Sequence, residues 1–419
     1  MQHNSSTRKV SLLSPAGSFE SLMAAIRAGA NAVYFGVEQL NMRAKSINSF
    51  SVEDLPEIVS ICKSHQVKSC LTLNTVMYDH DMQLIKRILE NVKHTGVDAV
   101  IASDFSVIEM CRSMSIPLHI STQANVSNIE AVKFFAPFSD LIVLARELSL
   151  KQVKAITSAI RRENIKGVSG NPLQIEVFVH GALCVAVSGK CYMSLHEQNA
   201  SANRGACTQN CRRPYKVVDL ETGNELEIDN EYIMSPQDLC TIPILDELVE
   251  AGVDVLKIEG RGKSADYVQT VTECYREALD AISSNSFNEA QIQDWMLRLK
   301  TVYNRGFWEG YYLGRKLGAW TKNPGSAATE RKAFVGKGRN YFSKISIAEF
   351  EIEATTIKKG DSILVIGRNF GAEKLVLDEF RVNGLPANEA KQGDLITFPF
   401  PHKTITTDKL YKLSPSSNA

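Results

Sequence analysis

Short apolar runs recur along the N-terminal part of the chain and alternate with segments of helical periodicity. One small phrase returns three times, at residues 28–36, 95–102 and 251–258. In each, a glycine that ends a helix is followed by a turn and a short β-branched, apolar strand. Further strand-like runs lie between these phrases, at residues 10–13, 67–73, 117–121, 140–144 and 174–179. The pattern therefore predicts eight strands.

Segments with a helical spacing of apolar positions separate these strands, at residues 18–28, 53–65, 81–94 and 150–163. The strands are continuous apolar runs, of the kind that parallel sheets bury on both faces. This alternation predicts an α/β fold, a (β/α)8 barrel of the TIM type. An open doubly wound sheet is the rival, but the segment Leu13-Ser-Pro-Ala-Gly-Ser-Phe19 after the first strand lacks the dinucleotide fingerprint.

The pattern changes after the eighth strand. Two helical segments are expected at residues 265–282 and 289–303, followed by a linker at 304–333 that carries glycine and lysine. From residue 334 to 415 short strands alternate with turn signals, which predicts a small antiparallel β-barrel. We therefore expect a barrel domain over residues 1–303 and a second domain over 334–415.

The chain contains 47 lysines and arginines in total and 47 aspartates and glutamates, so its formal net charge is zero. No global positive field indicates nucleic acid, so any RNA binding would depend on a local basic patch. The N-terminus lacks the apolar region of a secretory signal, and no apolar run approaches the ~18 residues of a membrane span. We expect a soluble cytoplasmic protein with no membrane partner.

Five of the nine cysteines fall within an unusually long segment between the seventh and eighth strands, at about residues 180–240. Four lie in loop-like sequence, at Cys184, Cys191, Cys207 and Cys240. Reduced thiols grouped in this way indicate metal binding or catalysis, although core filling remains an alternative. Their wide, uneven spacing suits an iron–sulfur cluster better than the tight pairs of zinc sites. The cysteines in helix-like or strand-like runs are expected to fill the core: Cys62, Cys70, Cys111 and Cys274.

Polar residues follow several strands at their carboxyl ends, where barrel enzymes place their chemistry. His180 and Glu259 are the candidate catalytic residues. Cationic and amide side chains are the candidate substrate-binding residues: Arg43, Asn74, Gln123, Arg146, Lys257 and Arg261. For any single one of them, a hydrogen bond or ion pair with a neighbouring loop is an equal alternative.

Hydrolytic motifs are incomplete. His196-Glu197 begins a zinc-peptidase motif, but Ala200 stands where the second histidine belongs. No Gly-x-Ser-x-Gly nucleophile elbow occurs in the sequence. Peptidase chemistry therefore has no self-evident machinery in this chain.

The chain resembles the collagenase-like peptidase family over essentially its whole length. The resemblance is carried by Glu176-x-Phe178-x-x-Gly181-Ala-Leu-Cys184 and by Gly189-x-Cys191-Tyr-Met-Ser194. The segments at residues 13–17, 30–36 and 257–261 are similar to further landmarks of that family. Several of its members resemble oxygen-independent hydroxylases that carry a [4Fe-4S] cluster on four cysteines. Carried over residue by residue, the ligands are Cys184, Cys191, Cys207 and Cys240, and Cys211 is a spare thiol.

Within the family, the length and the C-terminal domain are most similar to the tRNA wobble-uridine hydroxylases. The resemblance implies formation of 5-hydroxyuridine in the tRNA anticodon loop, with prephenate, a small dicarboxylate, as hydroxyl donor. A peptidase of this family and a hydroxylase of ribosomal RNA are the alternatives. Basic residues near the barrel mouth and the second domain are the candidate RNA contacts: Arg212, Arg213, Arg331, Lys332, Lys337 and Arg339.

Overall fold

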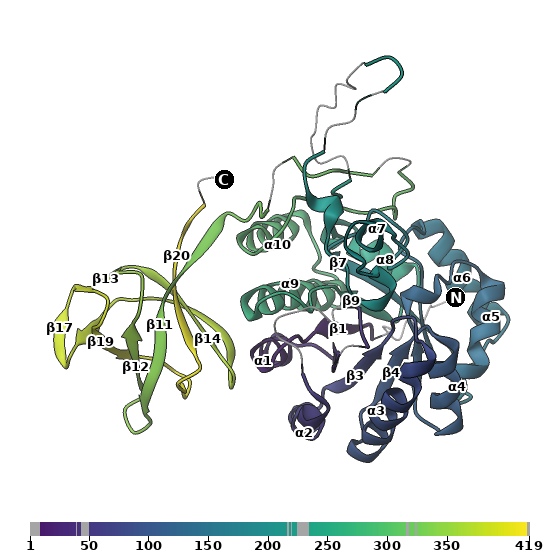
Figure 1. Cartoon of the computed structure of the whole chain (residues 1–419). Helices are drawn as coiled ribbons and strands as arrows, with labels where there is room; N and C mark the ends of the chain where they lie inside the picture. Colours follow the sequence, from purple (N-terminus) through teal and green to yellow (C-terminus); the bar gives the residue numbers. More distant parts are fainter. Residues whose placement is uncertain are drawn as a thin grey trace.

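The computed structural model describes residues 9–38, 40–42, 50–215, 218, 220–223, 234–315, 318–322 and 325–416. A barrel of parallel strands lies beside an antiparallel β-domain, and the helices surround the barrel (Figure 1). Within the described residues, no helix is both long enough and apolar enough to cross a membrane.

Eight parallel strands form the closed barrel that the sequence predicts. They are β1 (Ser11–Pro15), β2 (Ala32–Phe35), β3 (Lys68–Leu73), β4 (Ala99–Ala102), β5 (Leu118–Ile120), β6 (Leu141–Val143), β7 (Gln174–Gly181) and β9 (Val255–Ile258). Neighbours in sequence pair from β1 to β7, and β9 pairs with both β1 and β7. Leu256 is the register partner of Leu12 on one side and of Val177 on the other, which closes the ring.

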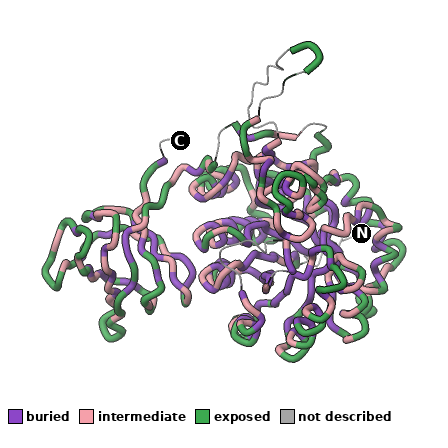
Figure 2. The backbone as a smooth tube through the Cα atoms, in the orientation of Figure 1, coloured by how far each residue is buried: buried purple, intermediate pink, exposed green. Residues whose placement is uncertain are grey.

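Helices cover the outside of this ring. They are α1 (Phe19–Arg27), α2 (Leu55–Ser64), α3 (Met82–Thr95), α4 (Phe105–Ser113), α5 (Ile129–Phe135), α6 (Leu150–Arg162), α8 (Leu245–Glu250), α9 (Ala265–Ser283) and α10 (Glu289–Thr301). Local sequence sets their ends: Ser149 and Gln152 form a capping box at the start of α6, and Gly96 ends α3 in the left-handed conformation. The strands and the inner helix faces are buried, whereas the outer helix faces are exposed (Figure 2).

The chain between β7 and β9 leaves the barrel and forms an insertion at its mouth, the carboxyl end of the strands. This insertion contains α7 (Met193–Gln198) and β8 (Asp238–Cys240). β8 runs antiparallel to the end of β7, where Cys240 is the register partner of His180. Strand β10 (Phe307–Trp308), from the segment expected to be a linker, then pairs in parallel with β8.

The C-terminal domain is an antiparallel sheet with the strand order β15-β14-β20-β11-β12-β19-β16-β17. Its strands are β11 (Glu330–Phe342), β12 (Ile347–Ile352), β14 (Ser362–Gly367), β15 (Gly371–Val376), β16 (Phe380–Val382), β17 (Leu385–Ala387), β19 (Leu395–Pro399) and β20 (Lys409–Pro415). A separate pair is formed by β13 (Ile357–Lys358) and β18 (Glu389–Ala390). The domain has a core of its own, which includes Val335, Phe350 and Phe398.

Strand β15 joins the two domains, because it packs against α1 and α9. At Gly371 its backbone comes so close to α1 that an added Cβ would lie 2.6 Å from the Ala24 nitrogen. The Arg368 guanidinium lies 3.5 Å above the Phe19 ring, and Arg27 pairs with Glu373 at 3.1 Å. The β-domain therefore packs directly against helices α1 and α9 of the barrel unit.

We predict that Gly371→Ala destabilises the protein more than Gly384→Ala. Both glycines have φ of +85°, so both substitutions carry the same left-handed strain of ~1–2 kcal/mol. Only the Cβ at position 371 meets α1, whereas nothing lies within 4 Å of the Cβ at 384. We expect overpacking to cost Gly371→Ala a further ~1–3 kcal/mol in the free energy of unfolding, measured by urea denaturation. Equal losses in the two variants would show that this domain contact does not depend on close approach.

Candidate functional site

A cleft of about 1270 Å³ opens at the barrel mouth and reaches the β-domain. Three parts of the chain supply its walls: the barrel loops, the insertion and the β-domain. Glu259 and Arg261 line it from the loop after β9, Cys207 from the insertion, and Lys409 and Tyr411 from β20. The cleft therefore contains candidate residues from the barrel loops and from the insertion, and the β-domain forms the wall facing them.

Arg261 is buried at the barrel end of this cleft. Its Nη1 donates to Asn41 Oδ1 at 3.1 Å and to Thr72 Oγ1 at 2.5 Å. Thr72 lies on β3 and Asn41 in the loop after β2, so the guanidinium is held between neighbouring strand ends. The sequence indicated Arg261 but neither of these partners, because the fold alone brings them to it.

Lys257 lies one layer deeper, inside the barrel. Its Nζ is 2.7 Å from Glu176 Oε1 and 4.6 Å from the centre of the Tyr34 ring. Both members of the ion pair are buried. Burial raises the pKa of the Glu176 carboxyl, and the charge of Lys257 opposes that shift. Lys257 thus serves first to neutralise a carboxylate on the neighbouring strand β7.

His180 is enclosed by aromatic rings at the end of β7. The ring centres of Tyr267, Tyr275 and Phe307 lie 6.1, 5.5 and 5.5 Å from that of His180. Burial lowers the pKa of His180 to about 3, so its imidazole stays neutral at ordinary pH. Of the two candidate catalytic residues, Glu259 lines the cleft, whereas His180 lies behind it.

Arg146 holds the first residues of the insertion. Its Nη1 donates to the Ala182 carbonyl at 3.0 Å, and its guanidinium lies 3.7 Å from the centre of the Phe178 ring. These contacts connect the loop after β6 to the chain leaving β7. Arg146 therefore shapes the mouth at a position next to the cysteine segment.

The two candidate amides also contact neighbouring loops. Asn74 accepts from the Met42 backbone at 3.4 Å and donates to Ser121 Oγ at 3.4 Å. Gln123 packs against the insertion, because a Cβ on Gly189 would lie 2.6 Å from Gln123 Oε1. Arg43 lies outside the described residues.

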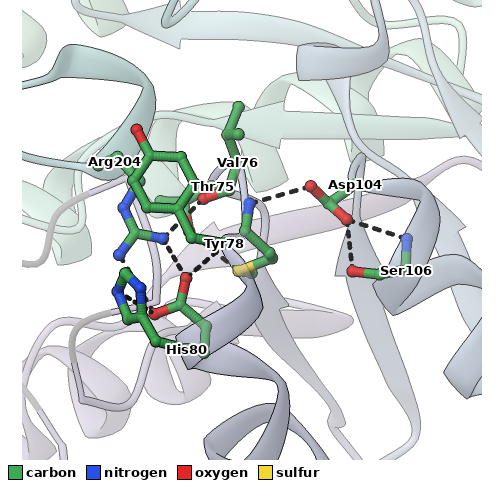
Figure 3. A network of polar contacts seen from close by, with 9 residues as sticks. Thr75, Val76, Tyr78, His80, Asp104, Ser106 and Arg204 are labelled. Carbon is green, nitrogen blue, oxygen red and sulfur yellow. Dashed lines mark hydrogen bonds and ion pairs between the residues drawn. The ribbon is translucent and has the colours of Figure 1, made fainter.

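A polar network fastens the insertion to the loop after β3 (Figure 3). Arg204 stacks on the Tyr78 ring at 4.3 Å, donates to the Val76 carbonyl at 2.9 Å and pairs with the Asp81 carboxylate. The hydrogen bond from Arg204 lowers the pKa of Asp81, which keeps that carboxyl ionised. His80 Nε2 lies 3.5 Å from Asp81 Oδ1. Sequence reasoning missed this anchor, since its members are far apart in the chain.

The candidate RNA contacts are mostly engaged within the protein. Arg212 donates to the Leu183 and Pro236 carbonyls, both at 2.6 Å, and so braces the insertion internally. Four of the remaining five pair with carboxylates, Arg213 with Glu197, Lys332 with Asp266, Lys337 with Glu353, and Arg339 with Glu351, whereas Arg331 is an exposed residue of β11. Surface pairs of this kind are weak and exchange readily with phosphate or water.

The expected core cysteines are confirmed as core residues, since Cys62, Cys70, Cys111 and Cys274 are all buried. The expected metal ligands differ in exposure: Cys184 and Cys207 are exposed, Cys191 is partly exposed and Cys240 is buried. Burial raises the pKa of the half-buried Cys211 thiol, and the charge of Arg212 opposes that shift. Cys240 is buried on β8 instead, with its Sγ 3.7 Å from Met296 Sδ.

A thiol-rich insertion of this kind fits an iron–sulfur group in the chemistry of its donors. Among the described residues, no three His, Cys, Asp or Glu side chains converge closely enough to hold a single metal ion. A cluster is larger than an ion, so its thiolates stand farther apart.

The architecture and the cysteine signature agree with a comparison against protein families. The model of peptidase family U32 matches residues 17–322, which include the barrel and the insertion. The chain belongs to peptidase family U32. The names given to its relatives differ in activity.

Three curated relatives illustrate that range. A protein of Porphyromonas gingivalis named collagenase is 49% identical over 401 residues, which cover 96% of this chain and 97% of the relative. The tRNA hydroxylation protein P1 of Bacillus subtilis is 32% identical over 374 residues, covering 86% and 84%. A 23S rRNA 5-hydroxycytidine synthase of Escherichia coli is 38% identical over 278 residues, covering 66% and 40%.

We predict that Lys257→Met costs about 3–5 kcal/mol in the free energy of unfolding, because it leaves the Glu176 carboxylate buried without its cation. The double variant Lys257→Met, Glu176→Leu should recover most of that loss, since it removes both charges together.

The single variant should also respond to pH in a defined direction. The pKa of Glu176 is raised in the folded protein, so folding is favoured where this carboxyl is protonated, and that contribution is lost as pH rises through the folded pKa. The defect of Lys257→Met relative to wild type should therefore shrink as pH falls. A defect that grows on acidification, measured by urea denaturation across pH, would contradict the buried pair.

Proposed function

We propose that this member of family U32 is an iron–sulfur-dependent RNA hydroxylase that forms 5-hydroxyuridine at the wobble position of tRNA. Prephenate is the proposed hydroxyl donor. One observation carries the proposal: a single cleft brings a cysteine of the thiol-rich insertion together with Glu259, Arg261 and the wall of the β-domain.

The size of the cleft favours a large substrate. Small-molecule pockets are usually about 300–1,000 Å³, whereas this cleft is about 1270 Å³. It has room for a small dicarboxylate and a nucleobase together. A base can enter from a single-stranded loop at a lower unstacking cost than from a helix, which suits an anticodon loop.

The charges along the cleft fit both substrates. Arg261 lies at its barrel end, and a guanidinium suits the carboxylates of a dianion such as prephenate. Lys332, Lys374 and Lys409 line the part formed by the β-domain, where an RNA backbone would pass. The arrangement thus provides a site for the donor near the barrel and a path for phosphates away from it.

Glu259 is the carboxylate placed to accept a proton in this cleft. Replacing the hydrogen on C5 of uridine by a hydroxyl group oxidises the base by two electrons: the donor that gives up its hydroxyl oxygen takes the electron pair, and the C5 hydrogen leaves as a proton, for which the buried Glu259 carboxylate is a suitable base. His180, enclosed and neutral, positions the end of β7 beside it. When bound, an iron–sulfur cluster supplies redox or Lewis-acid chemistry beside the reacting base.

The names of the relatives support an RNA substrate and also indicate the alternative functions. Homologues between 28% and 38% identical are named for hydroxylation of tRNA or for a 5-hydroxycytidine in 23S rRNA. The relative at 49% identity is named collagenase, which makes peptide hydrolysis the second candidate function. The two candidates differ in their product, so a product measurement separates them.

We predict that a strain without this protein loses 5-hydroxyuridine, or derivatives built on it, from the wobble position of some tRNAs. Mass spectrometry of nucleosides from separated tRNA and rRNA fractions measures this loss. Wild-type protein should restore the modification, whereas Arg261→Ala should not. A matched control is Arg162→Ala, which changes an arginine exposed on α6 and should restore it fully.

Blocking prephenate synthesis while the protein is present should cause the same loss. Unchanged tRNA together with a missing hydroxycytidine in rRNA would move the activity to the ribosomal substrate. Unchanged nucleosides in both fractions would contradict RNA hydroxylation altogether.

A further inference from the structure

Two cations contact one aromatic ring at the barrel mouth. Lys263 Nζ lies 3.1 Å from the centre of the Tyr303 ring, and the guanidinium carbon of Arg305 lies 5.1 Å from the same centre. Lys263 belongs to the loop after β9, whereas Tyr303 and Arg305 follow α10. All three residues line the cleft. Two separate segments of the chain therefore bring positive charge to one place in the cleft wall.

The Tyr303 ring holds Lys263 without cancelling its charge. An ammonium group is attracted to the electron-rich face of an aromatic ring, but the ring carries no net negative charge. Burial raises the pKa of the Tyr303 hydroxyl, and the charge of Arg305 opposes that shift, so the hydroxyl stays neutral at ordinary pH. The contact also fixes part of the flexible lysine side chain, which lowers the entropy cost of binding an anion.

Arg305 is braced from the interior of the protein. Its backbone N–H donates to Asp238 Oδ2 at 3.2 Å, and its Nη1 lies 3.6 Å from Asp238 Oδ1. The side chain of Asp238 is 4% exposed and that of Arg305 is 12% exposed, so the carboxylate is the deeper member of the pair. A guanidinium has five N–H donors, which is more than this pair engages. Arg305 can therefore bind an anion in the cleft while it keeps its contact with Asp238.

Exposure increases along the loop after β9. Glu259 and Arg261 are buried, Lys263 is half-buried, and Gly262 and Ser264 are exposed. A Cβ added to Gly262 would meet nothing within 4 Å, so the backbone beside Lys263 is open. A nucleobase can enter a buried site, whereas a phosphate keeps its charge and favours a site that water still reaches. The loop thus suits a base in its buried part and a phosphate at its rim.

We propose that Lys263 and Arg305 bind a phosphate group of the RNA next to the nucleotide whose base enters the cleft. This site rests on the proposed function for its RNA substrate and adds the contact that fixes the RNA backbone. Lysine is a compact point charge and arginine presents paired donors, and both suit phosphate oxygens. Base and phosphate are linked through one ribose, so a phosphate held here sets how far the base reaches toward Glu259. Such a contact positions the RNA without reading the identity of its bases.

Fluorescence anisotropy of an anticodon stem-loop RNA with an unmodified wobble uridine measures this contact on the anaerobically purified full-length protein. We expect Lys263→Gln to weaken binding about tenfold at low salt, because a hydrogen bond between two charged groups is lost. The slope of log affinity against log salt should flatten by about 0.7, the value for one phosphate of a single strand. Lys263→Arg keeps the charge and should bind as the wild type does. The matched control is Lys86→Gln, which removes an exposed lysine of α3 and should also leave binding unchanged.

RNA in which one phosphate is replaced by a neutral methylphosphonate locates the contact. The phosphates on the two sides of the wobble uridine are replaced one at a time. One of these replacements should weaken binding to the wild type and cause no further loss in Lys263→Gln. Unchanged RNA affinity in Lys263→Gln would overturn the proposal. So would a Lys263→Arg protein as weak as Lys263→Gln, or losses that add in the variant at both positions.

The carboxylates of the donor are the other source of an anion, and calorimetric titration with prephenate tests them on the same variants. Lys263→Gln should bind prephenate as tightly as the wild type. A folded variant, established by circular dichroism and melting temperature, that loses prephenate and keeps RNA would overturn the proposal and leave RNA hydroxylation standing. A wild-type protein that binds no RNA would contradict both the phosphate site and the proposed function.

Discussion

The pairing of β7 with β9 is the constraint on which the rest of this structure depends. These strands close the barrel, with Val177 opposite Leu256, so the 73 residues between Gly181 and Val255 have no place in the ring. They leave β7 at the barrel mouth, where they build the insertion, and return through α8 on the outside to the start of β9. Inside the ring, the ion pair of Glu176 and Lys257 joins the same two strands. A buried pair of this kind tolerates little displacement, because each charge depends on the other.

The barrel was predictable because each of its strands and helices is marked by a local sequence pattern that recurs along the chain. Each strand is an apolar run followed by helical spacing, and the phrase with a glycine and a turn marks the entry to β2, β4 and β9. The mouth residues were predictable for the same reason, since a strand's carboxyl end can be located from its sequence. Glu259 and Arg261 accordingly lie together in the cleft.

Contacts between side chains that lie far apart in the sequence were not predictable. His180 reads as a candidate acid or base, but Tyr267 and Tyr275 of α9 enclose it, and their distance in sequence hides that contact. Arg212 reads as an RNA contact, yet it braces the insertion through Leu183. The direction of the Cys240 side chain depends on how β8 pairs with β7, which no sequence pattern specifies.

Membership of family U32 fixes the fold but leaves the reaction to be read from the site. The cleft between barrel, insertion and β-domain is where the account places RNA, donor and cluster. The most direct measurement uses anaerobically loaded protein, unmodified tRNA and prephenate labelled with heavy oxygen in its hydroxyl group. The account predicts that the label appears in 5-hydroxyuridine of the tRNA. Cleavage of a collagen peptide at an equal rate with and without the cluster, and no label in the RNA, would contradict it.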